Sequence, residues 1–280
     1  MSIVMGAIMA ICAVFLAVGA TIPEWFVIAG RWLPALVSLL VLRVVALPGG
    51  PVRWWALRAG GWRQLLGGSA LTILALLTVY VLSVLPVLIL GTAQPQPAAA
   101  LGQVALALIP TIVLFSLSTF GEEVGWRGFL QRTLADRGFW RASLTVAAAW
   151  AAFHVPLHGA MAIQGTIPWL IAATSTVGLI PLGLFLSAAV VRFGSVWPAV
   201  FAHAVPLSAL NLISNAGDLP PGTHWILTAV TAVLLTGAAA LLARRQPAAD
   251  SARNGRMPSS TTSAIGRVPP SSNQRSNAAK

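Results

Sequence analysis

Long apolar segments recur along this 280-residue chain, and they constrain its fold more than any other feature. An α-helix needs about 20 predominantly apolar residues to cross the hydrocarbon core of a bilayer. Hydrophobic residues make up 57% of the chain and charged residues only 8%, a composition typical of polytopic membrane proteins. We expect about eight spans, near residues 3–22, 32–48, 69–91, 101–131, 142–158, 167–190, 196–214 and 224–243.

The predicted fold class is therefore all-α, a polytopic transmembrane helical bundle with both chain ends on one side. Residues 49–67 mix tryptophans with arginines, a composition that favours an anchoring segment at the membrane interface. Residues 244–280 are rich in Ser, Pro, Asn and Arg and carry too little apolar surface to offset the entropy of ordering. We expect this basic tail to be disordered and cytoplasmic.

The net charge of +11 comes mainly from basic residues in the loops and the tail. Seven basic residues and Asp250 give residues 244–280 a charge of +6. Basic tails and loops are typical of a cytoplasmic membrane face, and no aromatic-basic motif accompanies the charge, so we expect no nucleic-acid partner. Cys12 is the only cysteine, which excludes a disulfide framework and a thiolate metal cluster.

Orientation follows from the basic residues of the loops. If both ends are cytoplasmic, Arg31 alone falls on the outer side and Arg127 lies within a span. The loop arginines predicted to face inward are Arg43, Arg53, Arg58, Arg63, Arg132, Arg137, Arg141 and Arg192. We therefore expect a multi-pass protein of the cell inner (plasma) membrane with cytoplasmic N- and C-termini.

Two adjacent carboxylates, Glu122 and Glu123, fall inside a span, within the stretch FGEEVGWRGF. A charged side chain at a helix centre costs about 2.5–3.5 kcal/mol on insertion scales, so such groups usually face a bundle interior or a hydrated cavity and serve function. Consecutive helical residues point about 100° apart, so the two carboxylates must have different partners. Glu123 precedes Arg127 by four residues, the favourable order for an ion pair, which leaves Glu122 free to face a cavity.

Glycines surround this charged stretch at small-residue spacing. Gly121 and Gly125 are four residues apart, and Gly128 follows. Such spacing lets a neighbouring helix approach closely, so we expect these glycines to serve packing.

Two further spans each carry one strong polar group. His154 lies in WAAFHVPLH and His203 in WPAVFAHAVPLSALN. With about 1.5 Å of rise per residue, Glu122, His154 and His203 lie roughly 10–18 Å from the cytoplasmic edge. We predict one convergent site open to the cytoplasm, with His158 at the outer interface. Trp150 lies one turn before His154, and two roles stay open for it: restraining the His154 ring or packing as a core aromatic.

These residues resemble the CPBP or Abi intramembrane proteases, which include CAAX prenyl endopeptidases and bacteriocin-processing or self-immunity proteins. The first family motif, E-E-x-x-x-R, matches Glu122, Glu123 and Arg127, and the second matches Trp150-Ala-Ala-Phe-His154. The third normally reads H-x-x-x-N, and here His203 is followed at that offset by Leu207. Asn211 comes four residues later. The resemblance covers about residues 101–215.

The resemblance divides the chain into four regions. Residues 1–100 hold N-terminal transmembrane helices and the interfacial segment, 101–215 the catalytic core, 216–243 the last transmembrane helix, and 244–280 the tail.

The resemblance implies hydrolysis of a peptide bond near the cytoplasmic face, with Glu122 and His154 activating water. A carboxylate shielded from bulk water and a histidine suit general base catalysis. His203, with Asn211 as a second donor, would bind the developing oxyanion, and Arg127 would hold Glu123.

Two mechanisms are compatible with these residues. Glu122, His154 and His203 can ligate a zinc ion and leave a position for water. In that case the base would have to be Glu123, whose expected partner is Arg127. We favour the alternative, hydrolysis by glutamate and histidine without a metal cofactor.

The expected partners are the lipid bilayer and a membrane-tethered peptide or protein, either a CAAX-type C-terminus or a bacteriocin- or immunity-type substrate. Two other functions stay open. Intramembrane Glu and His groups also form proton relays in transporters. The missing third-motif asparagine is compatible with a catalytically silent immunity or scaffold protein.

Overall fold

The computed structural model describes residues 2–244, which lie within one compact unit and fold as an all-α bundle. The tail predicted to be disordered lies outside the described residues, apart from Arg244. The α-helices are α1 (Ser2–Ala17), α2 (Glu24–Gly30), α3 (Leu33–Val44), α4 (Gly50–Trp54), α5 (Trp62–Ile89), α6 (Ala98–Glu123), α7 (Gln131–Thr133), α8 (Phe139–Ile163), α9 (Trp169–Phe193), α10 (Trp197–His203) and α11 (Pro221–Arg244). Between α6 and α7 the chain continues as the π-helix η1 (Val124–Leu130), and short 3₁₀ turns are η2 (Ala135–Arg137), η3 (Ala209–Leu212) and η4 (Ala216–Asp218).

Six helical segments are long and apolar enough to cross a membrane: 24–44, 62–89, 98–133, 139–163, 169–193 and 221–244. The expectation of about eight spans differs from this set at three places. The first expected span is the shorter apolar helix α1, and the second begins earlier, because α2 and α3 together form the span 24–44. Residues 196–214 are not one helix: α10 ends at His203, and Pro206 follows in an irregular segment before η3.

Hydrogen bonds between connecting segments show which ends of the helices lie together. At one end of the bundle, Ser214 and Gln96 bond to the backbone of Gln94 and Leu212. At the other end, Val196 donates to the carbonyl of Ala56. The irregular segment after α10 therefore connects the two ends of the bundle, the path that a seventh long helix was expected to take.

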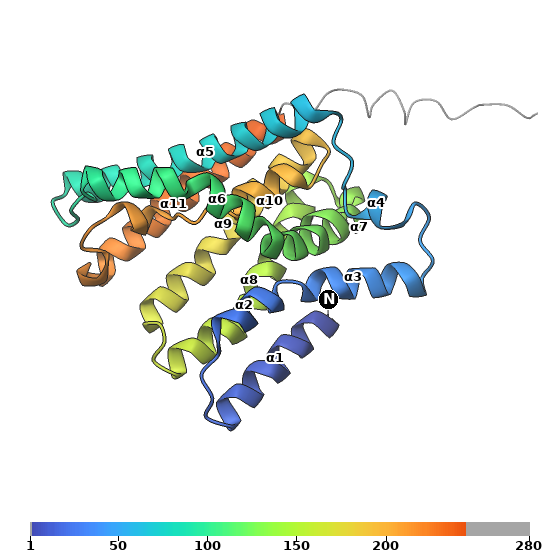
Figure 1. The fold of residues 1–280 in the computed structure, drawn as a ribbon, viewed down its shortest axis with the longest axis horizontal. Helices are drawn as coiled ribbons and strands as arrows, with labels where there is room; N and C mark the ends of the chain where they lie inside the picture. The colour runs from blue at the N-terminus through green and yellow to red at the C-terminus, as the bar shows by residue number, and fades with distance from the viewer. Residues whose placement is uncertain (1, 245–280) are drawn as a thin grey trace, which may run out of the picture. The chain divides into compact units, whose positions relative to one another are not determined.

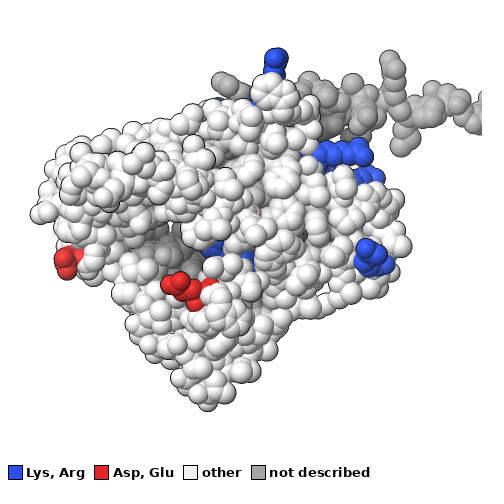
Figure 2. All heavy atoms as spheres, in the orientation of Figure 1, with Lys and Arg blue, Asp and Glu red and all other residues white. Residues whose placement is uncertain are grey.

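The basic residues gather at one end of these helices. Arg43, Arg132, Arg192 and Arg244 lie at the C-terminal ends of α3, α7, α9 and α11. Segments 90–97, 164–168 and 204–220, which connect the other ends, contain no Lys or Arg. In Figure 2 the visible basic atoms lie at the top, at the right and near the centre, and the visible acidic atoms lie at the left and near the centre.

Helix α6 and the π-helix after it lie at the centre of the site region. They pack against α3 on one side, and α6 packs against α10, while α8 packs against α9 and α1 (Figure 1). A β-carbon placed on Gly121 would lie 2.7 Å from the Arg31 carbonyl oxygen, and one on Gly128 would lie 2.7 Å from the Trp55 Cα. The prediction that these glycines permit close packing is therefore confirmed, and Gly125 makes the same kind of approach to Pro34.

Candidate active site

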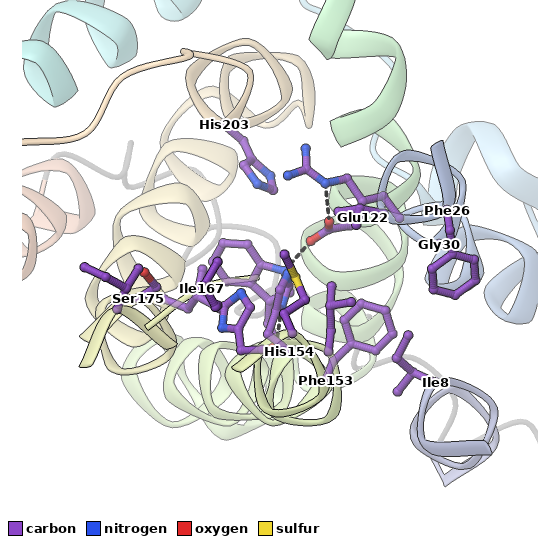
Figure 3. Close-up of a pocket in the computed structure, with 17 residues that line it drawn as sticks. Ile8, Phe26, Gly30, Glu122, Phe153, His154, Ile167, Ser175 and His203 are labelled. Carbon is purple, nitrogen blue, oxygen red and sulfur yellow. Dashed lines mark hydrogen bonds and ion pairs between the residues drawn. The ribbon is translucent and has the colours of Figure 1, made fainter. Parts of the chain in front are cut away.

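A cavity of about 360 Å³ opens between α1, α2, α6, α8, α9 and α10. Glu122, His154 and His203 all line it, each from a different helix (Figure 3). Its remaining wall is mostly apolar and includes Ile8, Phe26, Val27, Phe153, Leu157, Met161, Ile167, Ile171 and Leu179. The structure thus brings together the acid and the two imidazoles that the sequence predicted to converge.

Glu122 is completely buried, and its two oxygens have different partners. One oxygen accepts a hydrogen bond from the indole Nε1 of Trp150. The other lies 3.3 Å from Nε of Arg31 in an ion pair. The carboxylate is therefore oriented by one hydrogen bond and one ion pair while it faces the cavity (Figure 3).

Glu123 belongs to a separate network. Its Oε1 accepts a 2.9 Å hydrogen bond from Nη1 of Arg127, and both side chains are fully buried. The same oxygen lies 2.8 Å from Nδ1 of His203. Glu123 does not line the cavity around Glu122. The predictions that the two carboxylates have different partners, and that Glu123 pairs with Arg127, are confirmed.

Trp150 connects both networks. The Arg127 guanidinium carbon lies 4.1 Å from the centre of its ring, a cation–π contact. Its ring also packs edge-on against His154 and His203, with centroids 5.5 Å and 5.1 Å apart. Because the indole is fully buried, it fixes the relative positions of the Glu122 and Glu123 networks.

Each cavity histidine of α8 has a defined tautomer when neutral. Nδ1 of His154 lies 2.9 Å from the Trp150 carbonyl, which can only accept, so Nδ1 carries the proton and Nε2 is a free acceptor. Nδ1 of His158 lies 2.7 Å from the Thr176 hydroxyl, whose own proton is donated to the Ala172 carbonyl. His158 therefore donates through Nδ1 as well. His158 lines the cavity and bridges α8 to α9, and its expected position at the outer membrane interface stays a prediction.

Two residues lie where the sequence did not place them. Arg31, expected in an outer loop, lies inside the span 24–44, between α2 and α3, and contacts Glu122. Asn211 does not line the cavity around Glu122; it lines a different cavity, together with Leu207. Its side-chain oxygen accepts hydrogen bonds from the backbone and hydroxyl of Ser208. Asn211 is therefore not brought to the site as an oxyanion donor.

Arg31 is the residue that sequence reasoning missed. Placing the second span at 32–48 leaves Arg31 just outside it, whereas a span beginning at Glu24 includes it. The sequence does contain a signal for Arg31: two buried glutamates with one buried arginine leave one negative charge uncompensated, so a second cation is expected nearby. With Arg31, the cluster of Glu122, Glu123, Arg127 and Arg31 is balanced.

A metal ion requires a different arrangement of side chains. Within residues 2–244, no group of three or more His, Cys, Asp or Glu side chains is arranged to hold one. As the described side chains lie in this structure, they do not form a zinc site, and the favoured metal-independent mechanism stays a prediction.

Comparison with known families identifies the central part of the chain. Residues 103–206 match the family described as Type II CAAX prenyl endopeptidase Rce1-like. This range contains Glu122, Glu123, Arg127, Trp150, His154 and His203, and it excludes Arg31 and Asn211. No curated protein matches the chain. The match agrees with the resemblance to intramembrane CPBP proteases.

Proposed function

Since residues 103–206 are similar to the type II CAAX prenyl endopeptidases, a family-level match that supports an intramembrane endopeptidase, we propose that the protein cleaves a membrane-tethered peptide with water activated by Glu122 and His154. The observation that carries the proposal is the shared cavity. A fully buried carboxylate and an imidazole with a free Nε2 face the same space, which is large enough for part of a peptide chain.

In the proposed reaction, Glu122 removes a proton from water as the water oxygen attacks the scissile carbonyl carbon. The carbonyl π electrons move to the oxygen and form an oxyanion. Collapse of the tetrahedral intermediate breaks the C–N bond, and the leaving amine takes the proton from Glu122. Such general acid–base catalysis contributes typically 10²–10⁴-fold to a rate.

The histidines have separate roles in this mechanism. The free Nε2 of His154 can accept a hydrogen bond from the attacking water and orient it toward the carbonyl. His203 is fixed through Nδ1 by Glu123, which is in turn held by Arg127. The Glu123–Arg127 pair therefore positions an imidazole of the site and does not itself contact the substrate.

The proposed substrate enters from the membrane. Apolar side chains form most of the cavity wall and suit a lipid-attached or hydrophobic peptide segment. A prenylated CAAX C-terminus and a bacteriocin- or immunity-type peptide both fit this description. Comparing the termini of membrane proteins from cells with and without the protein would identify the natural substrate.

The decisive experiment uses purified full-length protein in liposomes with a prenylated CAAX peptide and with peptides found by that comparison. Glu122→Gln and His154→Ala are expected to lose cleavage while their thermal unfolding stays close to that of the wild type. Glu24→Gln is the matched control, since Glu24 is exposed and does not line the cavity. Cleavage at the wild-type rate by both site variants would refute the proposal.

The absence of asparagine at the usual third-motif position favours a second candidate, a catalytically silent immunity or scaffold protein. A cellular protection phenotype that survives Glu122→Gln would identify this function. Proton flux in the same liposomes without proteolysis would instead identify a transporter.

We also propose a metal-independent mechanism. Activity should survive dialysis against a metal chelator, and elemental analysis of the active protein should find no stoichiometric zinc. Loss of activity that zinc restores would overturn this part of the proposal.

We further propose that the protein lies in the plasma membrane with both termini in the cytoplasm. The arginines at the ends of α3, α7, α9 and α11 support this orientation by the positive-inside rule. Reporter fusions to each terminus that are active only in the cytoplasm would test it, and activity of a periplasmic reporter there would contradict it.

A further inference from the structure

Arg31 lies on the wall of the Glu122 cavity. Among the described residues that line this cavity, no other is Arg or Lys. Its side chain is 31% exposed, whereas that of Arg127 is fully buried behind Trp150. The contact with Glu122 is made through Nε, and that glutamate oxygen has no hydrogen-bond partner within residues 2–244. The ion pair is therefore loose, and the two terminal amino groups of Arg31 are not committed to it.

We propose that Arg31 donates hydrogen bonds to the oxyanion that forms when water attacks the scissile carbonyl. This inference rests on the proposed function, because it assigns a role within the same reaction. Arg31 lies outside residues 103–206, so the role does not come from the family match.

The charges of the reaction support this assignment. Before attack, the negative charge next to Arg31 is on the Glu122 carboxylate. As water adds to the carbonyl, its proton neutralises Glu122 and the negative charge appears on the carbonyl oxygen. The anionic partner of Arg31 thus changes from Glu122 to the oxyanion. The guanidinium stabilises the oxyanion in the transition state, and no charge is left uncompensated at any stage.

The other candidate donors are less suited to this role. Nδ1 of His203 donates to Glu123, so a neutral His203 presents Nε2 as an acceptor and can donate there only after taking a second proton. Asn211 faces another cavity. Arg31 is charged at every physiological pH and always donates.

Distance places Arg31 at the scissile bond and not at a distant substrate terminus. A water bound to Glu122 lies about 2.8 Å from its oxygen and attacks a carbon about 3–3.5 Å further on. If the substrate ends three residues beyond the scissile bond, its C-terminal carboxylate lies roughly 10 Å from that bond along an extended chain. Because Arg31 Nε is only 3.3 Å from Glu122, the scissile carbonyl is the nearer partner.

The packing of α6 supplies the position of Arg31. Gly121, immediately before Glu122, allows the Arg31 backbone to approach α6. A β-carbon at Gly121 would be 2.7 Å from the Arg31 carbonyl oxygen and the Trp32 Cα, both backbone atoms that cannot rotate away. The glycine therefore places the guanidinium beside the base.

The test compares Arg31→Gln and Arg31→Lys with the wild type in liposomes, using a cleaved peptide and its phosphinate analogue, in which a tetrahedral phosphinate replaces the scissile amide. We expect Arg31→Gln to lower kcat roughly 10²–10³-fold, as for loss of one oxyanion donor, and to weaken analogue binding in parallel. KM should change less than about threefold, because ground-state binding is not affected. Arg31→Lys should recover part of kcat. Arg43→Gln, an exposed arginine of α3, is the control.

A fall in kcat without weaker analogue binding, or an effect confined to KM, would overturn the proposal. Peptides with a free acid or an amide at the C-terminus provide a second criterion. The ratio of wild-type to Arg31→Gln activity should be the same for both peptides. If the two proteins cleave the amide peptide equally fast, Arg31 binds the substrate carboxylate instead.

Gly121→Ala provides a test without a change of charge. It should displace Arg31 and lower kcat and analogue affinity together, whereas Gly102→Ala on the exposed part of α6 should not, because a β-carbon there meets no atom within 4 Å. Unchanged kinetics for Gly121→Ala and Arg31→Gln, in protein that cleaves and requires Glu122, would refute the Arg31 role alone. Absence of cleavage by the wild type would refute the proposed function instead.

Discussion

Glu122 and Glu123 are adjacent and equally buried, but they lie in two regions with different access to the cavity. Glu122 faces the cavity and contacts an indole and a partly exposed arginine. Glu123 is enclosed by Arg127 and His203. A step of about 100° around the helix is enough to separate a carboxylate available to substrate from one that holds the structure.

The comparison also shows how the chain tolerates two buried negative charges. Burying a carboxylate is costly unless it is paired and hydrogen-bonded. Here Arg127 and Arg31 provide one cation for each carboxylate, and the Trp150 ring lies between the two networks. The Arg127 pair is closed to the cavity and the Arg31 pair is open to it, so the two pairs should respond differently to mutation.

The largest expected effect is on activity at Glu122. Glu122→Gln keeps the shape and an acceptor for Trp150 but removes the base, so cleavage should fall roughly 10²–10⁴-fold. The thermal unfolding temperature in detergent should stay the same or rise, since a buried charge has been removed. If Glu122→Gln instead unfolds readily and its folded fraction cleaves at the normal rate, Glu122 is structural and does not differ from Glu123 as proposed.

The opposite result is expected at the enclosed pair. Arg127→Met leaves Glu123 buried without its cation and should lower the free energy of unfolding by about 3–5 kcal/mol. The double variant Glu123→Gln/Arg127→Met should regain a large part of that loss, because no unpaired charge remains. Denaturation of the single and double variants measures the difference. Equal stability of Arg127→Met and the wild type would contradict a structural role for the pair.

The sequence predicted the fold class and most of this site, for a physical reason. Charged and imidazole groups inside apolar spans are costly, so Glu122, His154 and His203 were recognisable without a structure. Helical spacing then predicted the Glu123–Arg127 pair and the glycine contacts.

The positions of Arg31 and Asn211 were not predicted from the sequence, because both depend on where helices are interrupted. The break between α2 and α3 places Arg31 within a span, and the end of α10 at His203 turns Asn211 toward a different cavity. Hydropathy averages over about 20 residues and does not detect such breaks. The Glu123–His203 bond was missed because nothing in the spacing indicates which carboxylate an imidazole from another helix will contact.

A smaller effect is expected at the indole between the two networks. Trp150→Phe keeps a ring beneath Arg127 but removes the hydrogen bond to Glu122, and a bond to a charged group contributes about 1.5–3 kcal/mol. We therefore expect roughly a 10- to 100-fold loss of kcat/KM with Arg127 still paired. Trp126→Phe is the matched control, because this buried indole nitrogen has no hydrogen-bond partner within residues 2–244. Equal losses in both variants would assign the effect to packing.

The smallest expected effect is at Asn211. Asn211→Ala removes the hydrogen bonds to Ser208 at the start of η3, and loss of such a cap lowers stability by about 0.5–2 kcal/mol. Cleavage measured below the unfolding temperature should change less than about twofold, because Asn211 does not line the cavity that contains Glu122; loss of a single oxyanion donor would instead lower kcat roughly 10²–10³-fold. A loss of that size at Asn211 would show that the segment after α10 rearranges to reach the substrate, and the oxyanion role assigned to Arg31 would then have to be shared.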